Sequence, residues 1–373
     1  MTTVIRDIVC LLNKQQYSFP ETFQSLERVK CESSRVFMIH YPHYQQDHEG
    51  YSISVEERLV HIQLYTCANS EAANEALRET ISKIFYDFNI DRYMLWYDTS
   101  AAYGWTDHLL PSATVYHCTD LVATENASQQ MLLQRASTIL TDGLSAHEYL
   151  KTKFSNVYLL KSRVDLENFY EARYYKKDPI GQVNIPYPRI GCFGDGHLFD
   201  VELIKTLAET RPHWQFVVIA DTQDLELLSK FNNIHLLGWR GESKLAEYIS
   251  NWDVGIIPYG DENKRRFQNP KEITQLLAAG KPVVSTSMTD VLRTFGQNKL
   301  VRIAGTSAQM IMMIQEELKQ RDRVQWYNNV KDFLNERSLH NSLESVQFHF
   351  RTHYKFESTC KLSDSHKVEP ASA

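Results

Sequence analysis

Short apolar segments alternate with amphipathic stretches along most of the chain, and this alternation constrains the fold more than any other feature. The apolar segments have the length of buried strands, and the stretches between them have the spacing of helices with one apolar face. Such an order is typical of α/β proteins with parallel sheets covered by helices on both faces. The predicted strands are 6–12, 35–39, 59–64, 93–97, 114–118, 137–141, 157–160, 189–193, 215–220, 234–237, 254–258, 282–286 and 300–303. The predicted helices are 71–88, 129–135, 199–211, 225–231, 244–251, 271–279 and 308–321.

The alternation is interrupted near the middle of the chain. Residues 174–188 are polar and contain three prolines and one glycine, which is typical of a linker. A chain of 373 residues is longer than one hydrophobic core usually serves, so two domains are expected. The predicted division is a Rossmann-like domain in 1–172, a linker in 173–188, a second Rossmann-like domain in 189–335, a C-terminal segment in 336–358 and a disordered tail in 359–373.

The net charge and the positions of the cysteines limit the functional classes and the cellular compartment that we expect. The formal net charge is −6, whereas a protein that binds nucleic acid without regard to sequence normally has a basic excess, so no nucleic-acid partner is expected. The N-terminus lacks the pattern of a signal peptide, and no segment reaches the apolar length of a membrane span. Cys10, Cys118 and Cys192 lie in apolar runs and are interpreted as small buried hydrophobes. We therefore expect a cytoplasmic protein with at most peripheral membrane contact.

A glycine-rich segment, IGCFGDGH at 190–197, lies between a predicted strand and a predicted helix. Gly194 and Gly196, with Asp195 between them, allow a tight turn and a close approach to a ligand. The free N–H groups of the following helix suit a phosphate. The spacing is not that of the dinucleotide fingerprint, so an ordinary strand-to-helix turn explains the pattern equally well.

A second motif combines a basic loop with a helix start. Lys264 and Arg266 lie in a polar loop after a predicted strand, and a helix is predicted to begin with Asn269 as its cap and Pro270 in its first position. Gly280 is expected to end that helix. Ligands of open parallel sheets bind at the carboxyl ends of the strands, where cations and a helix N-terminus suit a diphosphate. A solvated basic loop is the alternative interpretation.

Several stretches carry a family resemblance. In the second half these are Phe193-Gly194 with the helix start Phe199-Asp200, the segment AEYISNWDVGIIP at 246–258 and the segment PKEITQLLAAGKPVV at 270–284. In the first half, DIVCLLN at 7–13, YHCTD at 116–120 and Val164-Asp165 with Phe169 agree more loosely. Through these residues the chain, over about 5–305, resembles bacterial GT-B glycosyltransferases of the group 1, glycan-assembly type.

The resemblance implies a GT-B fold, in which two Rossmann-like domains present parallel sheets to a central cleft and the last helix, here 336–358, crosses back to the first domain. It implies a hexosyltransferase-like enzyme whose donor is a UDP-, GDP- or dTDP-sugar, bound mainly by the C-terminal domain. A glycan, a lipid-linked sugar or a protein would be the acceptor and would enter from the N-terminal domain. The donor is a co-substrate, and neither a cofactor nor a metal is expected, because basic side chains and helix dipoles neutralise the leaving diphosphate.

The implied donor site also contains departures from the family. Its residues are Gly194, Asp195, Gly196, Trp239, Arg240, Lys264, Arg266, Asn269, Lys271, Glu272 and Gln275. Relatives usually carry Lys and then Glu where this chain has Glu272 and Gln275. Gln275 can still bond a ribose hydroxyl, as a neutral and weaker partner. The departures leave open an altered donor choice and the loss of catalysis.

Polar residues at the ends of N-terminal strands are the candidates for acid–base work. Asp98 follows the strand 93–97, and His117 and Asp120 follow the next strand. A base must lie within hydrogen-bond reach of the acceptor hydroxyl, and Asp120 is expected to orient the imidazole of His117. The alternative is that Asp98 and Asp120 cap the following helices.

Two other functions remain open beside transfer. A scaffold or sensor would keep the fold without turnover, and the changes at Glu272 and Gln275 favour it. A sugar-nucleotide epimerase would share the fold and need only the nucleotide sugar.

Overall fold

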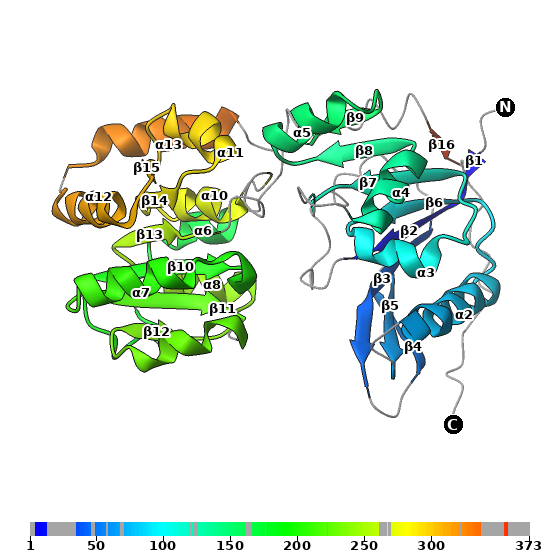
Figure 1. The fold of residues 1–373 in the computed structure, drawn as a ribbon, viewed down its shortest axis with the longest axis horizontal. Helices are drawn as coiled ribbons and strands as arrows, with labels where there is room; N and C mark the ends of the chain where they lie inside the picture. Colours follow the sequence, from blue (N-terminus) through cyan, green and yellow to red (C-terminus); the bar gives the residue numbers. More distant parts are fainter. Residues whose placement is uncertain are drawn as a thin grey trace.

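A computed structural model describes residues 4–12, 35–45, 49–56, 59–67, 71–119, 121, 126–160, 166–175, 177–221, 223–260, 267, 270–320, 322–336 and 354–356. These residues form two lobes, each built around its own sheet (Figure 1). The N-terminal lobe holds a sheet of eight strands and the C-terminal lobe a sheet of six. The predicted α/β class with parallel Rossmann-like sheets is confirmed.

The N-terminal sheet has the strand order β4-β5-β3-β2-β6-β7-β8-β9. Its strands are β2 (Asp7–Leu11), β3 (Arg35–Tyr44), β4 (Gly50–Glu56), β5 (Leu59–Thr66), β6 (Tyr93–Tyr97), β7 (Ala113–His117), β8 (Thr138–Thr141) and β9 (Val157–Leu159). Its helices are α2 (Glu71–Asp87), η1 (Ser100–Ala102), α3 (Tyr103–Thr106), α4 (Ala127–Arg135) and α5 (Leu144–Lys151). All neighbours pair in parallel except β4, which runs antiparallel to β5 at the sheet edge and was not predicted.

Both faces of the N-terminal sheet are buried. Along β2, Val9 and Leu11 join one core cluster, which includes Ile81 of α2, while Ile8 and Cys10 join the cluster on the opposite face. Successive side chains of a strand point to opposite faces, so a continuous apolar run is the expected sequence of a strand covered on both sides. Cys10, Cys118 and Cys192 are buried as predicted.

The C-terminal sheet is fully parallel, with the order β12-β11-β10-β13-β14-β15. Its strands are β10 (Arg189–Gly194), β11 (Gln215–Ala220), β12 (Ile234–Leu236), β13 (Val254–Ile257), β14 (Val283–Thr286) and β15 (Arg302–Ala304). Its helices are α6 (Glu167–Glu171), η2 (Gly196–Leu198), α7 (Val201–Thr210), η3 (Gln223–Lys230), α8 (Glu242–Ile249), α10 (Lys271–Ala278), α11 (Thr289–Val291), η4 (Leu292–Gly296), α12 (Ser307–Lys319) and α13 (Val324–Glu336). The order reverses between β10 and β13, the position where ligands bind in such sheets.

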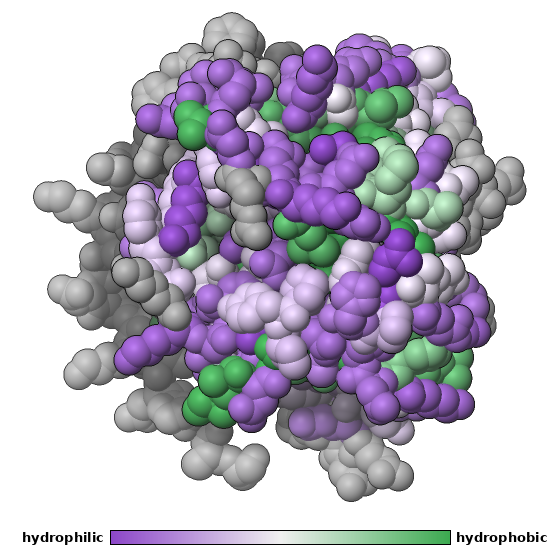
Figure 2. Space-filling model, turned by 90° about the vertical axis from the view of Figure 1, so that its left-hand side faces the viewer, coloured by the Kyte–Doolittle hydropathy of each residue, from purple (hydrophilic) through white to green (hydrophobic). Residues whose placement is uncertain are grey.

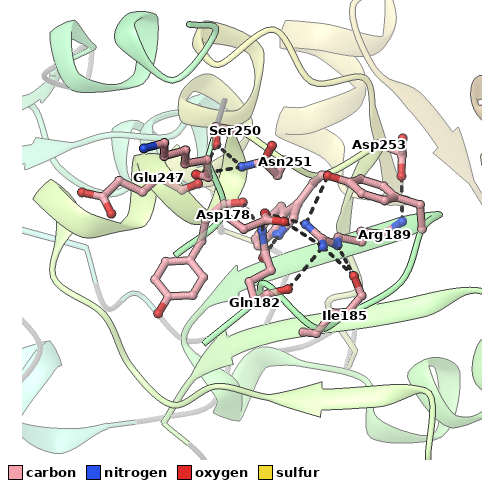
Figure 3. Close-up of polar contacts among 12 residues, drawn as sticks. Asp178, Gln182, Ile185, Arg189, Glu247, Ser250, Asn251 and Asp253 are labelled. Carbon is pink, nitrogen blue, oxygen red and sulfur yellow. Dashed lines mark hydrogen bonds and ion pairs between the residues drawn. The ribbon is translucent and has the colours of Figure 1, made fainter. Parts of the chain in front are cut away.

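The segment predicted as a linker packs on the C-terminal lobe. Arg189 is buried, and its guanidinium bonds both carboxylate oxygens of Asp178, at 2.6 and 3.0 Å, and the carbonyl oxygen of Ile185 at 2.8 Å (Figure 3). The side chain of Gln182 donates to the carbonyl of Tyr248. These bonds pair the buried charge, as a buried guanidinium requires. Phe169, ahead of the predicted linker, also lies in the C-terminal core, and the predicted boundaries stay predictions.

The end of the described chain returns to the N-terminal lobe. β16 (Lys355–Phe356) pairs in parallel with β1 (Val4–Ile5), and the hydroxyls of Tyr354 and Thr138 lie 2.6 Å apart (Figure 1). A helix was expected over 336–358, but Lys355–Phe356 forms a strand, and residues 337–353 lie outside the described residues, as does the tail at 359–373.

The face of the C-terminal lobe that points away from the N-terminal lobe is mainly hydrophilic, with apolar residues in small separate patches (Figure 2). Within the described part of the chain, no helix has both the length and the apolar character needed to cross a bilayer.

Candidate functional site

At the carboxyl edge of the N-terminal sheet, an imidazole is held between two carboxylates. His117 ends β7, and its Nδ1 lies 3.0 Å from Oδ1 of Asp98, which follows β6. Its Nε2 lies 2.9 Å from Oδ1 of Asp142, which follows β8. Because the three strands are neighbours in parallel register, their ends bring the side chains together. We call Asp98, His117 and Asp142 the His117 cluster.

Asp98 and His117 are buried, whereas Asp142 is partly exposed. Burial by itself lowers the pKa of His117, but the carboxylate of Asp142 and the hydrogen bonds that the imidazole donates to Asp142 and Asp98 outweigh burial, and the pKa is raised well above its usual value. With both ring nitrogens bonded to carboxylates, the imidazole is a charged double donor. Oδ1 of Asp98 also accepts from Nε1 of Trp96 at 3.1 Å. Oδ2 of Asp98 is buried and has no hydrogen-bond partner among the described residues.

The structure brings Asp98 and His117 together but changes the expected pairing. The imidazole is oriented by Asp98 and Asp142, and Asp120 lies outside the described residues. Asp142 was missed, although it directly follows the predicted strand 137–141 and the same strand-end rule would have found it. The roles of Asp98, His117 and Asp120 in catalysis stay predictions.

At the carboxyl edge of the C-terminal sheet, β10 runs into a turn that only glycine fits. Gly194 has φ +131°, and a Cβ there would lie 2.9 Å from Oε1 of Glu272. A Cβ on Gly196 would lie 2.7 Å from the carbonyl oxygen of Asp221. Asp195 accepts from the backbone N–H of His197 at 3.0 Å and begins η2. The turn therefore brings bare backbone next to the Glu272 side chain.

Glu272 supplies a buried carboxyl at this edge. It lies in the first turn of α10. Pro270 occupies the N-cap position of this helix, one residue after the predicted cap, Asn269. Burial raises the pKa of Glu272, while the hydroxyl of Tyr259, which hydrogen-bonds to it, lowers that pKa. Burial and the nearby carboxylates of Glu272 and Asp195 raise the pKa of Tyr259 well above its usual range. Tyr259 follows β13 and was not among the predicted site residues.

The other predicted donor residues fall into three groups. Lys271 is exposed in the first turn of α10, and Gln275 is buried one turn further on. Arg240 contacts Tyr248 of α8, with its guanidinium 5.8 Å from the ring centre, and its neighbour Trp239 is half exposed. Three residues lie outside the described part of the chain: Lys264, Arg266 and Asn269. The structure thus groups the Gly194 turn with Glu272 and Tyr259, and places the side chain of Arg240 against Tyr248 of α8.

The turn after β10 is tied to the end of β13. The N–H of Asp200 donates to the carbonyl oxygen of Pro258 at 2.7 Å, and the N–H of Gly260 donates to that of Leu198 at 2.8 Å. Gly280, in the predicted position after α10, has φ +73°. In the part of the chain that the structure describes, no three His, Cys, Asp or Glu side chains are arranged to hold a metal ion.

Comparison with known proteins agrees with this geometry. Residues 190–332 match the model of the family "Glycosyl transferases group 1". The chain is 26% identical over 234 residues to TuaH of Bacillus subtilis (strain 168), which is described as a teichuronic acid biosynthesis glycosyltransferase. That match covers 54% of this chain and only 57% of the TuaH sequence.

Solved structures show the same fold. Sucrose-phosphate synthase of Thermosynechococcus elongatus has a TM-score of 0.69 at 13% identity, covering 93% of this chain and 98% of that one. Anabaena HepE in complex with UDP and glucose has a TM-score of 0.64 at 11% identity, covering 92% and 98%. The fold is therefore GT-B, and the resemblance seen in the sequence is confirmed.

Proposed function

We propose that this chain, which carries a C-terminal domain of the glycosyl transferases group 1 family on a GT-B fold, is a glycosyltransferase that moves a sugar from a nucleoside diphosphate to a glycan, lipid-linked or protein acceptor. The observation that carries the proposal is the family match over 190–332, because that range contains every predicted donor-binding residue. The UDP and glucose bound to the similar HepE structure support the same donor class.

The donor is a UDP-, GDP- or dTDP-sugar, with its diphosphate at the Gly194 turn and the start of α10. Backbone N–H groups at a helix start and the cation of Lys271 would stabilise the leaving diphosphate, joined by Lys264 and Arg266 of the preceding loop. These cations support transfer of a hexose without a bound metal. The buried carboxyl of Glu272, whose pKa burial raises, is suited to bond a sugar hydroxyl rather than a phosphate.

The acceptor side is assigned to the His117 cluster. Because both nitrogens of His117 are bonded to carboxylates, the role of base falls to Asp98, whose buried Oδ2 has no hydrogen-bond partner among the described residues. His117 and Asp142 hold Asp98 in place, and Asp120 stays a second candidate in the same segment. We assign the protein to the cytoplasm, with at most peripheral contact with a membrane that carries the acceptor.

Nucleotide binding and product analysis test the proposal together. Thermal unfolding is measured with UDP, GDP and dTDP, and the correct nucleotide at 100 times its Kd should stabilise the protein by about 2.7 kcal/mol. The corresponding nucleotide sugar is then incubated with and without candidate acceptors, and the released diphosphate and labelled product are measured.

Three outcomes would redirect the proposal. The absence of stabilisation by any of the nucleotides would contradict the donor site. Binding without turnover would indicate a scaffold or sensor, which the Glu272 and Gln275 departures favour. Conversion of the sugar in the absence of an acceptor would indicate an epimerase.

A further inference from the structure

Helix α5 of the N-terminal lobe begins without a side-chain cap from its own lobe. Gly143 occupies the N-cap position and forms no side-chain capping bond. The first N–H groups of a helix need acceptors, which a capping side chain usually provides. Here the acceptor comes from the other lobe: both carboxylate oxygens of Asp290, in α11, accept from the N–H of Ser145, at 2.9 and 3.2 Å.

The contact between Ser145 and Asp290 is buried and specific. Asp290 is only 2% exposed, and its Oδ1 also accepts from the hydroxyl of Ser145 at 2.6 Å. A carboxylate at a helix N-terminus is stabilised by the free N–H groups and by the helix dipole. Beside it, Arg293 forms an exposed ion pair with Glu148 of α5, at 2.7 Å. Asp290 therefore acts as the cap that α5 lacks.

The start of α5 also carries the carboxylate that holds His117. Asp142 lies three residues before Ser145, between the end of β8 and the beginning of α5. Its Oδ1 lies 2.9 Å from Nε2 of His117. The backbone of residues 142–145 is thus fixed at one end by His117 and at the other by Asp290.

We propose that Asp290 is a positioning residue for glycosyl transfer: by capping α5 from the C-terminal lobe, it holds Asp142 against His117 and sets the acceptor-side carboxylates relative to the donor lobe. This inference rests on the proposed function. Because Asp290 belongs to the C-terminal lobe, the positions of the acceptor-side carboxylates depend on how the two lobes meet. Sugar transfer would therefore occur only when Asp290 contacts the start of α5. Asp290 itself touches neither substrate in this assignment.

Hydrogen exchange tests the cap without any substrate. In Asp290→Ala, the amides of the first turn of α5 should exchange roughly fivefold faster or more, since a capping side chain is lost. Asp290→Asn keeps an acceptor oxygen and should restore most of the protection. Arg293→Ala, the matched control, removes the neighbouring ion pair and should leave exchange at that turn within about twofold of the parent chain. Parent-like exchange in Asp290→Ala would overturn the inference.

Kinetics test the positioning role. Asp290→Ala should lower kcat by roughly tenfold and raise the KM for the acceptor, because an element that is about 1 Å out of place costs up to a hundredfold in rate. The Kd for the nucleoside diphosphate should stay unchanged, and Asp290→Asn should recover most of the kcat. Faster exchange with parent-like kcat and KM would overturn the positioning role. A parent chain that consumes no nucleotide sugar would overturn the proposed function instead, and the exchange rates would still separate that result from a failed cap.

Discussion

At the carboxyl edge of the N-terminal sheet, Asp98 and Asp142 share the imidazole of His117, whereas at the matching edge of the C-terminal sheet Glu272 has a tyrosine hydroxyl as its partner. Both edges bury carboxyl groups. The first pairs two carboxylates with one imidazole supplied by the fold, and the second leaves a carboxyl whose pKa is raised by burial. The N-terminal edge thus contains its own cation, while the C-terminal edge has a carboxyl suited to a hydrogen-bonding ligand.

The largest expected effect comes from breaking the charged unit. Asp98→Ala leaves two buried donors, Nδ1 of His117 and Nε1 of Trp96, without their acceptor and should lower the free energy of unfolding by about 2–6 kcal/mol, at about 1–3 kcal/mol for each buried polar group left unsatisfied. Chemical denaturation measures the change. Asp91→Ala is the control, because Asp91 forms an exposed pair with Arg6 and should cost at most about 1 kcal/mol. Similar losses in both variants would show that the His117 cluster does not depend on the buried carboxylate of Asp98.

A smaller effect is expected at the C-terminal edge. Gly194→Ala places a Cβ at φ +131° and 2.9 Å from Glu272, which should cost about 1–3 kcal/mol of stability and weaken nucleotide binding. Gly241→Ala is a matched control, since a Cβ there meets nothing within 4 Å and φ is −59°, and its cost should be within about 0.5 kcal/mol. Denaturation and calorimetric titration with the nucleotide report the two effects. Equal behaviour of the two variants would remove the special role of the Gly194 turn.

The smallest expected effect is a gradual change of the free energy of unfolding with pH. The pKa of His117 is higher in the folded protein than in the unfolded chain, so the folded state binds more protons between the two values. Its stabilisation is present in full below about pH 6.5 and is lost as pH rises through the raised pKa, by at most about 1.4 kcal/mol per pH unit. The difference in unfolding free energy between the parent chain and His117→Gln should therefore shrink above pH 6.5. A difference that stays constant with pH would mean that His117 is not charged.

The sequence predicted the residues at the carboxyl edges of the sheets better than it predicted which side chains bond to one another. Apolar runs predicted β6, β7 and β10, and the strand-end rule placed Asp98, His117 and Gly194 at the carboxyl ends of these strands. The same rule also applies to Asp142, which follows the predicted strand 137–141, but its pairing with His117 depends on β8 lying next to β7, which only the fold shows. The antiparallel strand β4 was missed although GYSISVE alternates polar and apolar residues as a half-buried strand does, because the prediction relied on continuous apolar runs.

No local sequence pattern predicts the contacts between the two lobes. Asp290 caps α5 through Ser145, which lies 145 positions earlier in the chain, and neither segment carries a signal for the other. The same holds for the Tyr259–Glu272 bond, which needs the end of β13 and the start of α10 to be adjacent in space. Local propensity determines where an element begins and ends, whereas cross-contacts follow from the packing of the whole sheet.

The pairing of β16 with β1 has a mechanical consequence. Leu334 of α13 packs in the C-terminal core and Tyr354 contacts Thr138, so the chain passes between the lobes twice, once before α6 and once between 336 and 354. Because two crossings of the chain join the lobes, one lobe can rotate relative to the other about the line through both crossings, whereas rotation about other axes is resisted. The first and last described strands, β1 and β16, both belong to the N-terminal lobe, so the C-terminal lobe is an insertion between them.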